Sequence, residues 1–264
     1  MITNPYLPQP AEIISITKET TTDYTFRLKT DIQPDFGQFV EVSIPKVGEA
    51  PISVSNAQPG WIELTIRRVG HLTNELHELK PGDLLFIRGP YGKGFPKEQY
   101  RDKSLIIAAG GTGLAPVRNL INYYYQHPGE VRQLSLLMGF KTPEDILFKE
   151  DIEKWRSKFQ VLLTVDKESP GWSGHVGLIT NFVKDAVGEN SSASRVIIVG
   201  PPLMMKFTSQ EFIKYNIPEE NIWLSFERKM CCGIGKCGHC RINDTYVCLE
   251  GPVFPYITAK NLLD

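Results

Sequence analysis

The stretch SLIIAAGGTGLAP, residues 104–116, decides the fold of the central part of this chain. Its first part, residues 104–109, is an apolar run, as expected for a parallel strand that is buried on both faces. Glycines follow at once, and a helical stretch covers residues 115–126. A strand, a glycine turn and a helix in this order form the place where an open α/β sheet binds a nucleotide pyrophosphate.

The glycine turn supplies the first candidate binding residues, which are Gly110, Gly111, Thr112 and Gly113. Glycines allow the backbone to approach a ligand closely, and the helix N-terminus offers free N–H groups. The third glycine of a G-x-G-x-x-G fingerprint is replaced by Pro116, and no Gly-Lys-Ser/Thr of a Walker motif follows. A purely structural tight turn is the alternative.

Toward the C-terminus the same alternation continues. Apolar strands are expected at 134–139, 160–165 and 195–200, and residues 142–145 (Thr-Pro-Glu-Asp) have the composition of a helix start. Strands that alternate with helices predict a doubly wound α/β domain. A second glycine turn, Gly200-Pro201-Pro202, follows the last of these strands and should lie at the same sheet edge. We take Gly200 and Pro201 as further binding candidates, and Met204 and Met205 as helix core.

Toward the N-terminus the pattern changes to short strands. We expect them at 13–16, 24–28, 38–44 and 61–67, and the last two alternate apolar and polar residues as half-buried strands do. Strands at this spacing predict an antiparallel β-barrel. We place the domain boundary near residue 98, which gives a barrel at 1–97, an α/β domain at 98–224 and a small subdomain at 225–264.

One helix is expected within the barrel region, at 72–79, just after Gly70. A glycine followed closely by Thr73 at a helix start could cradle a phosphate through N–H groups and a hydroxyl. An ordinary threonine cap is the alternative. Arg67 could serve the same anion or only end its strand.

The last part of the chain contains all five cysteines, between Cys231 and Cys248. Four of them follow the spacing C-x4-C-x2-C-x7-C, and they are Cys232, Cys237, Cys240 and Cys248. C-x4-C-x2-C followed by a distant cysteine is the plant-type 2Fe–2S arrangement. Glycines at 233, 235 and 238 would let this loop curl so that its N–H groups point at the sulfurs, which favours the reduced cluster.

A structural zinc ribbon is the alternative for these four thiols. Zinc sites usually have two close cysteine pairs separated by a longer gap, whereas here three cysteines crowd into nine residues. The spacing therefore favours an iron–sulfur cluster. Cys231 could replace Cys232 as a ligand, but its spacing fits less well, and a small buried thiol is the simpler interpretation.

Composition excludes several classes of function. Lys plus Arg is 29 and Asp plus Glu is 30, so the chain lacks the basic excess of a nucleic-acid binder. No apolar run approaches the ~18 residues that cross a bilayer, and the N-terminus lacks the pattern of a signal peptide. We therefore expect a cytoplasmic protein without a membrane or nucleic-acid partner. Clustered cysteines in such a chain argue against a disulfide framework.

Five motifs spread over the whole chain now carry a resemblance to the ferredoxin–NADP reductase superfamily. They are Pro51-Ile52-Ser53, Gly70-His71-Leu72-Thr73, Gly89-Pro90-Tyr91-Gly92, Gly110-Gly111-Thr112-Gly113-Leu114-Ala115-Pro116 and Gly200-Pro201-Pro202-Leu203-Met204-Met205. The four cysteines narrow it to a subgroup with the electron-transfer subunits of dihydroorotate dehydrogenase, hydrogenase gamma subunits and B subunits of anaerobic sulfite reductases. The chain is most similar to the last, through 4–8 (Asn-Pro-Tyr-Leu-Pro), 50–55, 235–240 and 246–254.

The resemblance implies FAD in the barrel and NAD(P)H on the α/β domain. It places Ser53 near flavin N5 and makes Ser53 and Thr112 the catalytic candidates. The FAD-binding candidates that it implies are Pro51, Ile52, Ser53, Arg67, Gly70, Leu72 and Thr73. The sequence also departs from the family: Ala50 replaces an arginine that grips a flavin phosphate, Ile52 replaces an aromatic residue, and Val199 replaces a cysteine.

The resemblance implies a reductase module that oxidises NADH with FAD and passes single electrons through the cluster to a partner. The partner would be a sirohaem sulfite reductase subunit or a ferredoxin-like subunit. A hydrogenase or dihydroorotate dehydrogenase partner is the alternative, and a nucleotide sensor with a zinc ribbon is a non-redox alternative. NADH is preferred to NADPH because residues 139–145 offer one Lys, two acids and no Arg for a 2′-phosphate.

Overall fold

The computed structural model describes residue 4 and residues 6–188 and 193–262, and it divides the chain into two compact units. The first unit combines the chain up to Phe95 with Glu227–Pro252. The second combines Pro96–Phe226 with the residues from Val253 onward. Residues 225–264, which the sequence suggests as one subdomain, thus divide between the two units.

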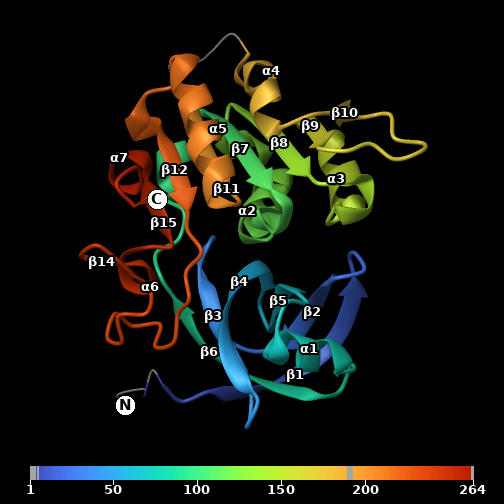
Figure 1. The fold of residues 1–264 in the computed structure, drawn as a ribbon, viewed down its shortest axis with the longest axis vertical. Helices are drawn as coiled ribbons and strands as arrows, with labels where there is room; N and C mark the ends of the chain where they lie inside the picture. Colours follow the sequence, from blue (N-terminus) through green and yellow to red (C-terminus); the bar gives the residue numbers. More distant parts are fainter. Residues whose placement is uncertain (1–3, 5, 189–192, 263–264) are drawn as a thin grey trace. The chain divides into compact units, whose positions relative to one another are not determined.

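A closed antiparallel barrel of six strands forms most of the first unit (Figure 1, blue to teal). The strands are β1 (Gln9–Lys18), β2 (Asp23–Lys29), β3 (Phe39–Ile44), β4 (Gly48–Gln58), β5 (Trp61–Arg67) and β6 (Leu84–Tyr91), in the order β1-β2-β5-β4-β3-β6. The predicted barrel is confirmed. Alternating apolar residues such as Val40, Val42, Leu64 and Ile87 fill its interior, each fully buried. Helix α1 (His71–Glu78) lies where the sequence predicts a helix.

Strand β3 differs from the expected half-buried strand, because residues 39–42 are all buried. Val40 and Val42 belong to the barrel core, so Glu41 between them points away from it. Glu41 is nevertheless fully buried. The outer face of the barrel at β3 and β6 is therefore covered by other residues. Cys231 and Cys232 contact it there, through hydrogen bonds from Arg88 of β6.

The C-terminal part of the first unit is short and irregular. It contains the two-stranded ribbon of β13 (Arg241–Ile242) and β14 (Thr245–Tyr246), followed by the short helix α6 (Val247–Glu250). Here we call residues 229–240 the cluster loop. Its three glycines, Gly233, Gly235 and Gly238, have φ between 69° and 83°, in the left-handed region that favours glycine.

The second unit is built on one seven-stranded sheet (Figure 1, green to red). Its order is β10-β9-β8-β7-β11-β12-β15, with strands β7 (Ser104–Gly110), β8 (Gln133–Phe140), β9 (Gln160–Val165), β10 (His175–Val176), β11 (Arg195–Val199), β12 (Ile222–Ser225) and β15 (Val253–Pro255). All neighbours are parallel except β15, which runs antiparallel to β12. Chain order reverses at β7, which makes the β7–β11 edge the switch point of a doubly wound fold.

Helices accompany these strands as predicted. They are α2 (Leu114–Gln126), α3 (Lys149–Arg156), α4 (Val183–Val187), α5 (Pro202–Lys214) and α7 (Tyr256–Ala259), with 3₁₀ turns η1 (Lys97–Tyr100), η2 (Gly111–Gly113), η3 (Pro128–Glu130), η4 (Pro143–Asp145), η5 (Ile179–Phe182) and η6 (Glu219–Asn221). Among the described helices, none is long and apolar enough to cross a membrane.

The predicted helix start at residues 142–145 is wrong in one respect. Thr142 and Asp145 do form a reciprocal capping box, but it closes the single turn η4. Residues Ile146, Leu147 and Phe148 then are all buried, and Phe148 has a φ of 54°. Three consecutive buried side chains do not fit one face of a helix, so α3 begins only at Lys149.

Candidate functional site

The two glycine turns of the second unit lie together, as predicted. Strands β7 and β11 are parallel neighbours with Ala109 opposite Val199, so the turns that follow them meet at one sheet edge. Ligands of open α/β sheets bind beyond this end of the strands. The structure therefore brings the two predicted glycine turns together at one edge of the sheet. Gly110–Gly113 lie on one side, and Gly200 and Pro201 lie on the other.

The glycines in these turns have two different roles. A Cβ on Gly113 would lie 2.4 Å from the carbonyl oxygen of Val199, and Cβ atoms on Gly110 and Gly200 would lie 2.9 and 2.5 Å from the sulfur of Met204. These three glycines allow the turns to pack on each other. Gly111 instead has a φ of 55° and open space where its Cβ would be. This open backbone fits close approach by a pyrophosphate.

The first turn of α2 fits the same ligand, because it contains no acidic side chain that would repel an anion. Thr112 precedes this helix and is half-buried. Met205 is buried, as the core interpretation predicts, while Met204 is half-buried and fills the space between the two turns.

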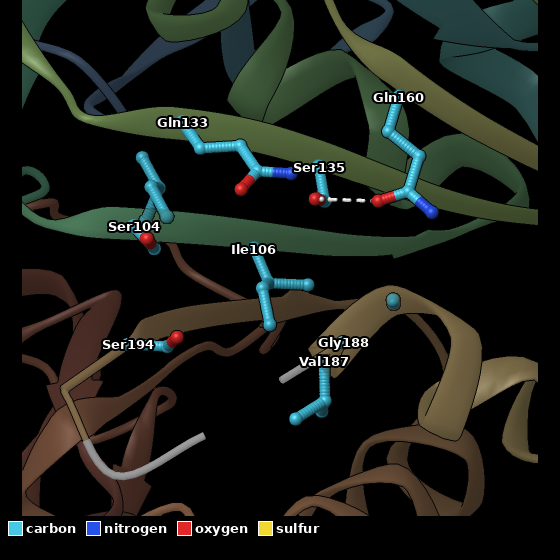
Figure 2. Close-up of a pocket in the computed structure, with 10 residues that line it drawn as sticks. Ser104, Ile106, Gln133, Ser135, Gln160, Val187, Gly188 and Ser194 are labelled. Atoms are coloured by element: carbon cyan, nitrogen blue, oxygen red, sulfur yellow. Dashed lines mark hydrogen bonds between the residues drawn. The ribbon is translucent and has the colours of Figure 1, made fainter. Parts of the chain in front are cut away.

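A cavity in the second unit lies elsewhere and gathers none of the predicted site residues. It has a volume of about 260 Å³, and Figure 2 shows its lining. Ser104, Gln133 and Gln160 begin strands β7, β8 and β9, so the cavity lies at the amino ends of the strands. Nucleotides bind at the opposite ends, so this cavity does not belong to the candidate nucleotide site.

In the first unit, the predicted phosphate residues lie at the start of α1, where Gly70 and Thr73 differ in their roles. Gly70 has open space at its Cβ position, and the first turn of α1 contains no acid. The Thr73 hydroxyl accepts the N–H groups of Val69 and Gly70, both at 2.9 Å, and donates to the Gly70 carbonyl at 3.1 Å. The hydroxyl of Thr73 therefore caps its own turn, which is the alternative considered above.

Arg67 is held by an internal partner. Its guanidinium forms two hydrogen bonds with the buried carboxylate of Asp23, at 2.8 and 3.1 Å. Burial alone would raise the pKa of Asp23, but the bonds from Arg67, Thr20 and Thr22 outweigh it and lower the pKa. The geometry thus gives Arg67 a structural ion pair.

The predicted flavin motif, Pro51-Ile52-Ser53, lies in β4 beside β3. Ser53 is half-buried opposite Phe39, Ile52 is opposite Val40, and Pro51 is opposite Glu41. The Phe39 ring packs on Tyr91 with 5.8 Å between centroids. A Cβ on Gly233 of the cluster loop would lie 2.8 Å from the Tyr91 ring. A short chain of contacts therefore joins the flavin motif to the cluster loop within one unit.

The four predicted ligand cysteines are gathered in the cluster loop and its continuation into α6. The Cys232 sulfur accepts N–H groups from Ile234, Lys236 and Cys237 at 3.5, 3.3 and 3.5 Å. Gly235 N–H donates to the Cys248 sulfur at 3.2 Å, and Cys248 N–H donates to the Cys240 sulfur at 3.4 Å. The predicted N–H groups that point at the sulfurs are confirmed.

The thiols also pair in a way that fits two irons. The Cys232 sulfur accepts the N–H of Cys237, and the Cys240 sulfur accepts the N–H of Cys248. A 2Fe–2S cluster places two thiolates on each of its two irons, so the chemistry and the pairing of these four cysteines fit it. Among the described residues, no three His, Cys, Asp or Glu side chains already stand close enough together to hold a metal ion. Backbone N–H from His239 chiefly lowers the pKa of the exposed Cys237, whereas burial raises the pKa of Cys248 to about 12. Cys231 is exposed, so the expectation that it is buried is wrong.

A charged group beneath the cluster loop was missed by sequence reasoning. Arg88 in β6 is buried and donates to the carbonyls of Cys231 and Cys232, and it forms an ion pair with Glu49. Glu41 lies opposite Arg88 in the ladder, and burial raises its pKa to about 7 against the opposing effect of Arg88. A charged residue within the apolar strand 84–91 was the signal available in the sequence.

Comparison with known protein families agrees with this geometry. Residues 11–95 match the oxidoreductase FAD-binding domain, residues 107–210 the oxidoreductase NAD-binding domain, and residues 227–258 the iron–sulfur cluster binding domain of dihydroorotate dehydrogenase B. The sulfhydrogenase 1 gamma subunit of Pyrococcus furiosus is 33% identical and covers 99% of this chain and 96% of its own. The chain belongs to the ferredoxin–NADP reductase superfamily.

Other relatives agree with this membership. The probable NAD-linked dihydroorotate dehydrogenase B electron transfer subunit of Pyrococcus furiosus is 34% identical, over 90% of this chain and 85% of its own. The structure of an NADH-dependent reduced ferredoxin–NADP oxidoreductase matches with a TM-score of 0.79 at 23% identity, over 97% and 90% of the two chains. This member of the superfamily is thus an oxidoreductase with FAD, NAD and iron–sulfur binding domains.

Proposed function

We propose that this chain is the electron-transfer subunit of a hetero-oligomeric enzyme, which oxidises NADH and delivers single electrons to a catalytic partner subunit. The observation that carries the proposal is the contact chain Ser53–Phe39–Tyr91–Gly233, which joins the flavin motif to the cluster loop in one unit. When bound, FAD supplies the conversion between a two-electron donor and a one-electron carrier.

The residues divide the task between the two units. The backbone at Gly111 and the helix start at Leu114 would bind the pyrophosphate of NADH, with Thr112 and Gly200 beside it. The β4 motif with Ser53 would hold the flavin ring, and Gly70, Leu72 and Thr73 would place backbone near its phosphates. Cys232, Cys237, Cys240 and Cys248 would ligate a 2Fe–2S cluster, whose reduced form the N–H···S bonds favour.

NADH rather than NADPH is part of the proposal. Thr142 and Asp145 cap each other beyond the end of β8, and Glu144 accepts a hydrogen bond from Ser169. Acids in this segment would repel a 2′-phosphate. The relative named as an NAD-linked dihydroorotate dehydrogenase subunit supports the same choice.

For the partner, the relatives favour a hydrogenase or a dihydroorotate dehydrogenase catalytic subunit. The sulfite reductase partner that the sequence motifs suggest has no counterpart in the names of these relatives. We therefore place it second. A cytoplasmic location belongs to the same proposal, because four thiolates that ligate a cluster must stay out of disulfides, as they do in a reducing compartment.

The test is an anaerobic absorption spectrum of the purified protein before and after NADH, with a Cys237→Ser variant. Flavin bands over an iron–sulfur envelope should both bleach in the wild type. In the variant, flavin bleaching should survive while electron delivery to the partner fails. A colourless protein that contains zinc would contradict the proposal.

The partner is identified with the native complex. NADH-dependent hydrogen evolution, dihydroorotate-dependent NAD⁺ reduction and NADH-dependent sulfite reduction are measured side by side, with Cys231→Ser as the matched control for loss of a thiol. Activity in the first or second assay supports the proposed partner. Activity in the sulfite assay alone overturns that choice and leaves the electron-transfer role intact.

A further inference from the structure

A single buried guanidinium joins the barrel to the cluster loop. Arg88 lies in β6 and is 5% exposed. Its Nη1 donates to the carbonyl oxygen of Cys232 at 2.8 Å, and its Nη2 donates to that of Cys231 at 2.7 Å. These carbonyls are consecutive along the chain. One planar group therefore fixes the backbone at the first cysteine of the C-x4-C-x2-C motif.

The other contacts of Arg88 fix the guanidinium itself. Its Nε donates to Glu49 of β4 at 2.8 Å, its Nη2 bonds to the second oxygen of that carboxylate, and its Nη1 also donates to the Tyr91 hydroxyl at 3.1 Å. All three nitrogens are in use. Only a planar fork of donors can serve a carboxylate and two carbonyls at once, so lysine would not replace it.

The charges around this group are few and close together. Glu41 of β3 lies opposite Arg88 in the strand ladder, and neither of its carboxyl oxygens has a hydrogen-bond partner among the residues that the structure describes. Glu49 carries the balancing negative charge and is partly exposed. Arg88 rather than Glu49 donates to the carbonyls of the cluster loop, so the positive end of this ion pair faces Cys232 in a buried setting, where screening by water is weak.

We propose that Arg88 is a positioning residue of the iron–sulfur site, which fixes the backbone of Cys232 and whose charge favours the more negative, reduced form of the cluster. The inference rests on the proposed function, because it requires that Cys232 is a cluster ligand. It assigns a role to a barrel residue outside the cysteine motif.

Two variants separate the charge from the geometry. Arg88→Gln removes both, and Arg88→Lys keeps the charge but cannot bridge Glu49 and both carbonyls. Arg27→Gln is the control, because Arg27 also forms an ion pair on the barrel, with Glu63, and has no contact with the cluster loop among the described hydrogen bonds. The midpoint potential is read from a redox titration followed by electron paramagnetic resonance. Hydrogen exchange reports the amides of residues 232–237.

In Arg88→Gln we expect a reduction constant at least tenfold lower, which is about 59 mV for one electron. The amides should also exchange faster. In Arg88→Lys the amides of residues 232–237 should exchange faster, while the midpoint potential stays near that of the wild type. In Arg27→Gln neither the amide exchange nor the midpoint potential should change. If Arg88→Gln keeps both the wild-type potential and the wild-type exchange, the inference is overturned while the cluster assignment survives. A wild-type protein without a cluster overturns both.

A third variant covers the case in which Arg88→Gln does not fold. Glu49→Gln leaves the bonds from Arg88 to the two carbonyls and removes a negative charge beside them, so the potential should rise. An unchanged potential in Glu49→Gln would overturn the electrostatic role of this group.

Discussion

Asp23 is a residue whose contribution to stability depends on pH. It is fully buried, and Arg67, Thr20 and Thr22 all donate to its carboxylate. Asp23→Asn should lower the free energy of unfolding near neutral pH by about 1.5–3 kcal/mol, the usual loss for hydrogen bonds to a charged group. Urea unfolding measures this, and Asp31→Asn at an exposed position is the control.

The sign of the pH dependence follows from the lowered pKa of Asp23. An acid with a lowered native pKa contributes stability above its unfolded pKa and loses it as the pH falls through the native pKa. The difference between wild type and Asp23→Asn should therefore narrow on acidification below about pH 4. A difference that stays constant from pH 7 to pH 3 would contradict this assignment.

At the scale of an element, two glycines of the turn after β7 have different roles: Gly113 allows close packing, and Gly111 leaves space for a ligand. Gly113→Ala places a methyl group against the Val199 carbonyl at 2.4 Å, so this variant should lose stability strongly. Gly111→Ala meets no atom and should cost only roughly 1–2 kcal/mol for its left-handed backbone. It should instead weaken NADH binding, because its methyl group fills the open space. Melting temperature and NADH titration distinguish the two variants.

The cluster loop supports a second prediction at this scale. Cys232→Ser should lose iron, because the sulfur of Cys232 accepts three N–H groups and lies beside Cys237. Cys231→Ser should keep iron, because its neighbour occupies the position that fits the spacing. Iron content and visible absorbance of the two purified variants provide the measurement. Iron loss in Cys231→Ser with retention in Cys232→Ser would reverse the ligand assignment.

At the scale of the whole molecule, the C-terminal part of the chain contributes to both units: Glu227–Pro252 belong to the first unit and the residues from Val253 onward to the second. A chain ending at Pro252 keeps the cluster loop but loses β15, whose Phe254 is buried against Phe226. It should keep its iron and unfold at a lower temperature. A chain ending at Phe226 should lose the iron as well. Calorimetry and iron analysis check both truncations, and loss of iron from the longer chain would contradict the division into units.

The sequence predicts the architecture well, because its signals are local. Period-two alternation predicts the barrel strands, unbroken apolar runs predict the parallel strands, and glycines mark the turns at Gly110 and Gly200. The capping box at Thr142 and Asp145 is also local and forms, but burial of the next three residues stops the helix. Local signals decide elements wherever tertiary packing does not oppose them.

The charged group under the cluster loop could not be predicted in the same way. In the strand pattern, Glu41 has the place of a solvent-facing residue, and Arg88 is one charge within an apolar strand. Their burial depends on Cys231 and Cys232, which are 143 and 144 residues from Arg88 along the chain. The periodicity and composition of a single strand contain no information on contacts with residues so far away in the sequence.

That same separation sets an order of events during synthesis on the ribosome. At about 5–20 residues per second, the 144 residues between Arg88 and Cys232 take roughly 7–30 s to be made. Domains generally fold as units, and the cluster loop belongs to the same unit as the barrel. This unit can therefore be completed only after residues 96–226 of the second unit have been made. Iron can be ligated only after Cys248 has been made, so the cover of Glu41 and Arg88 and the four cysteines become available at the same late stage of synthesis.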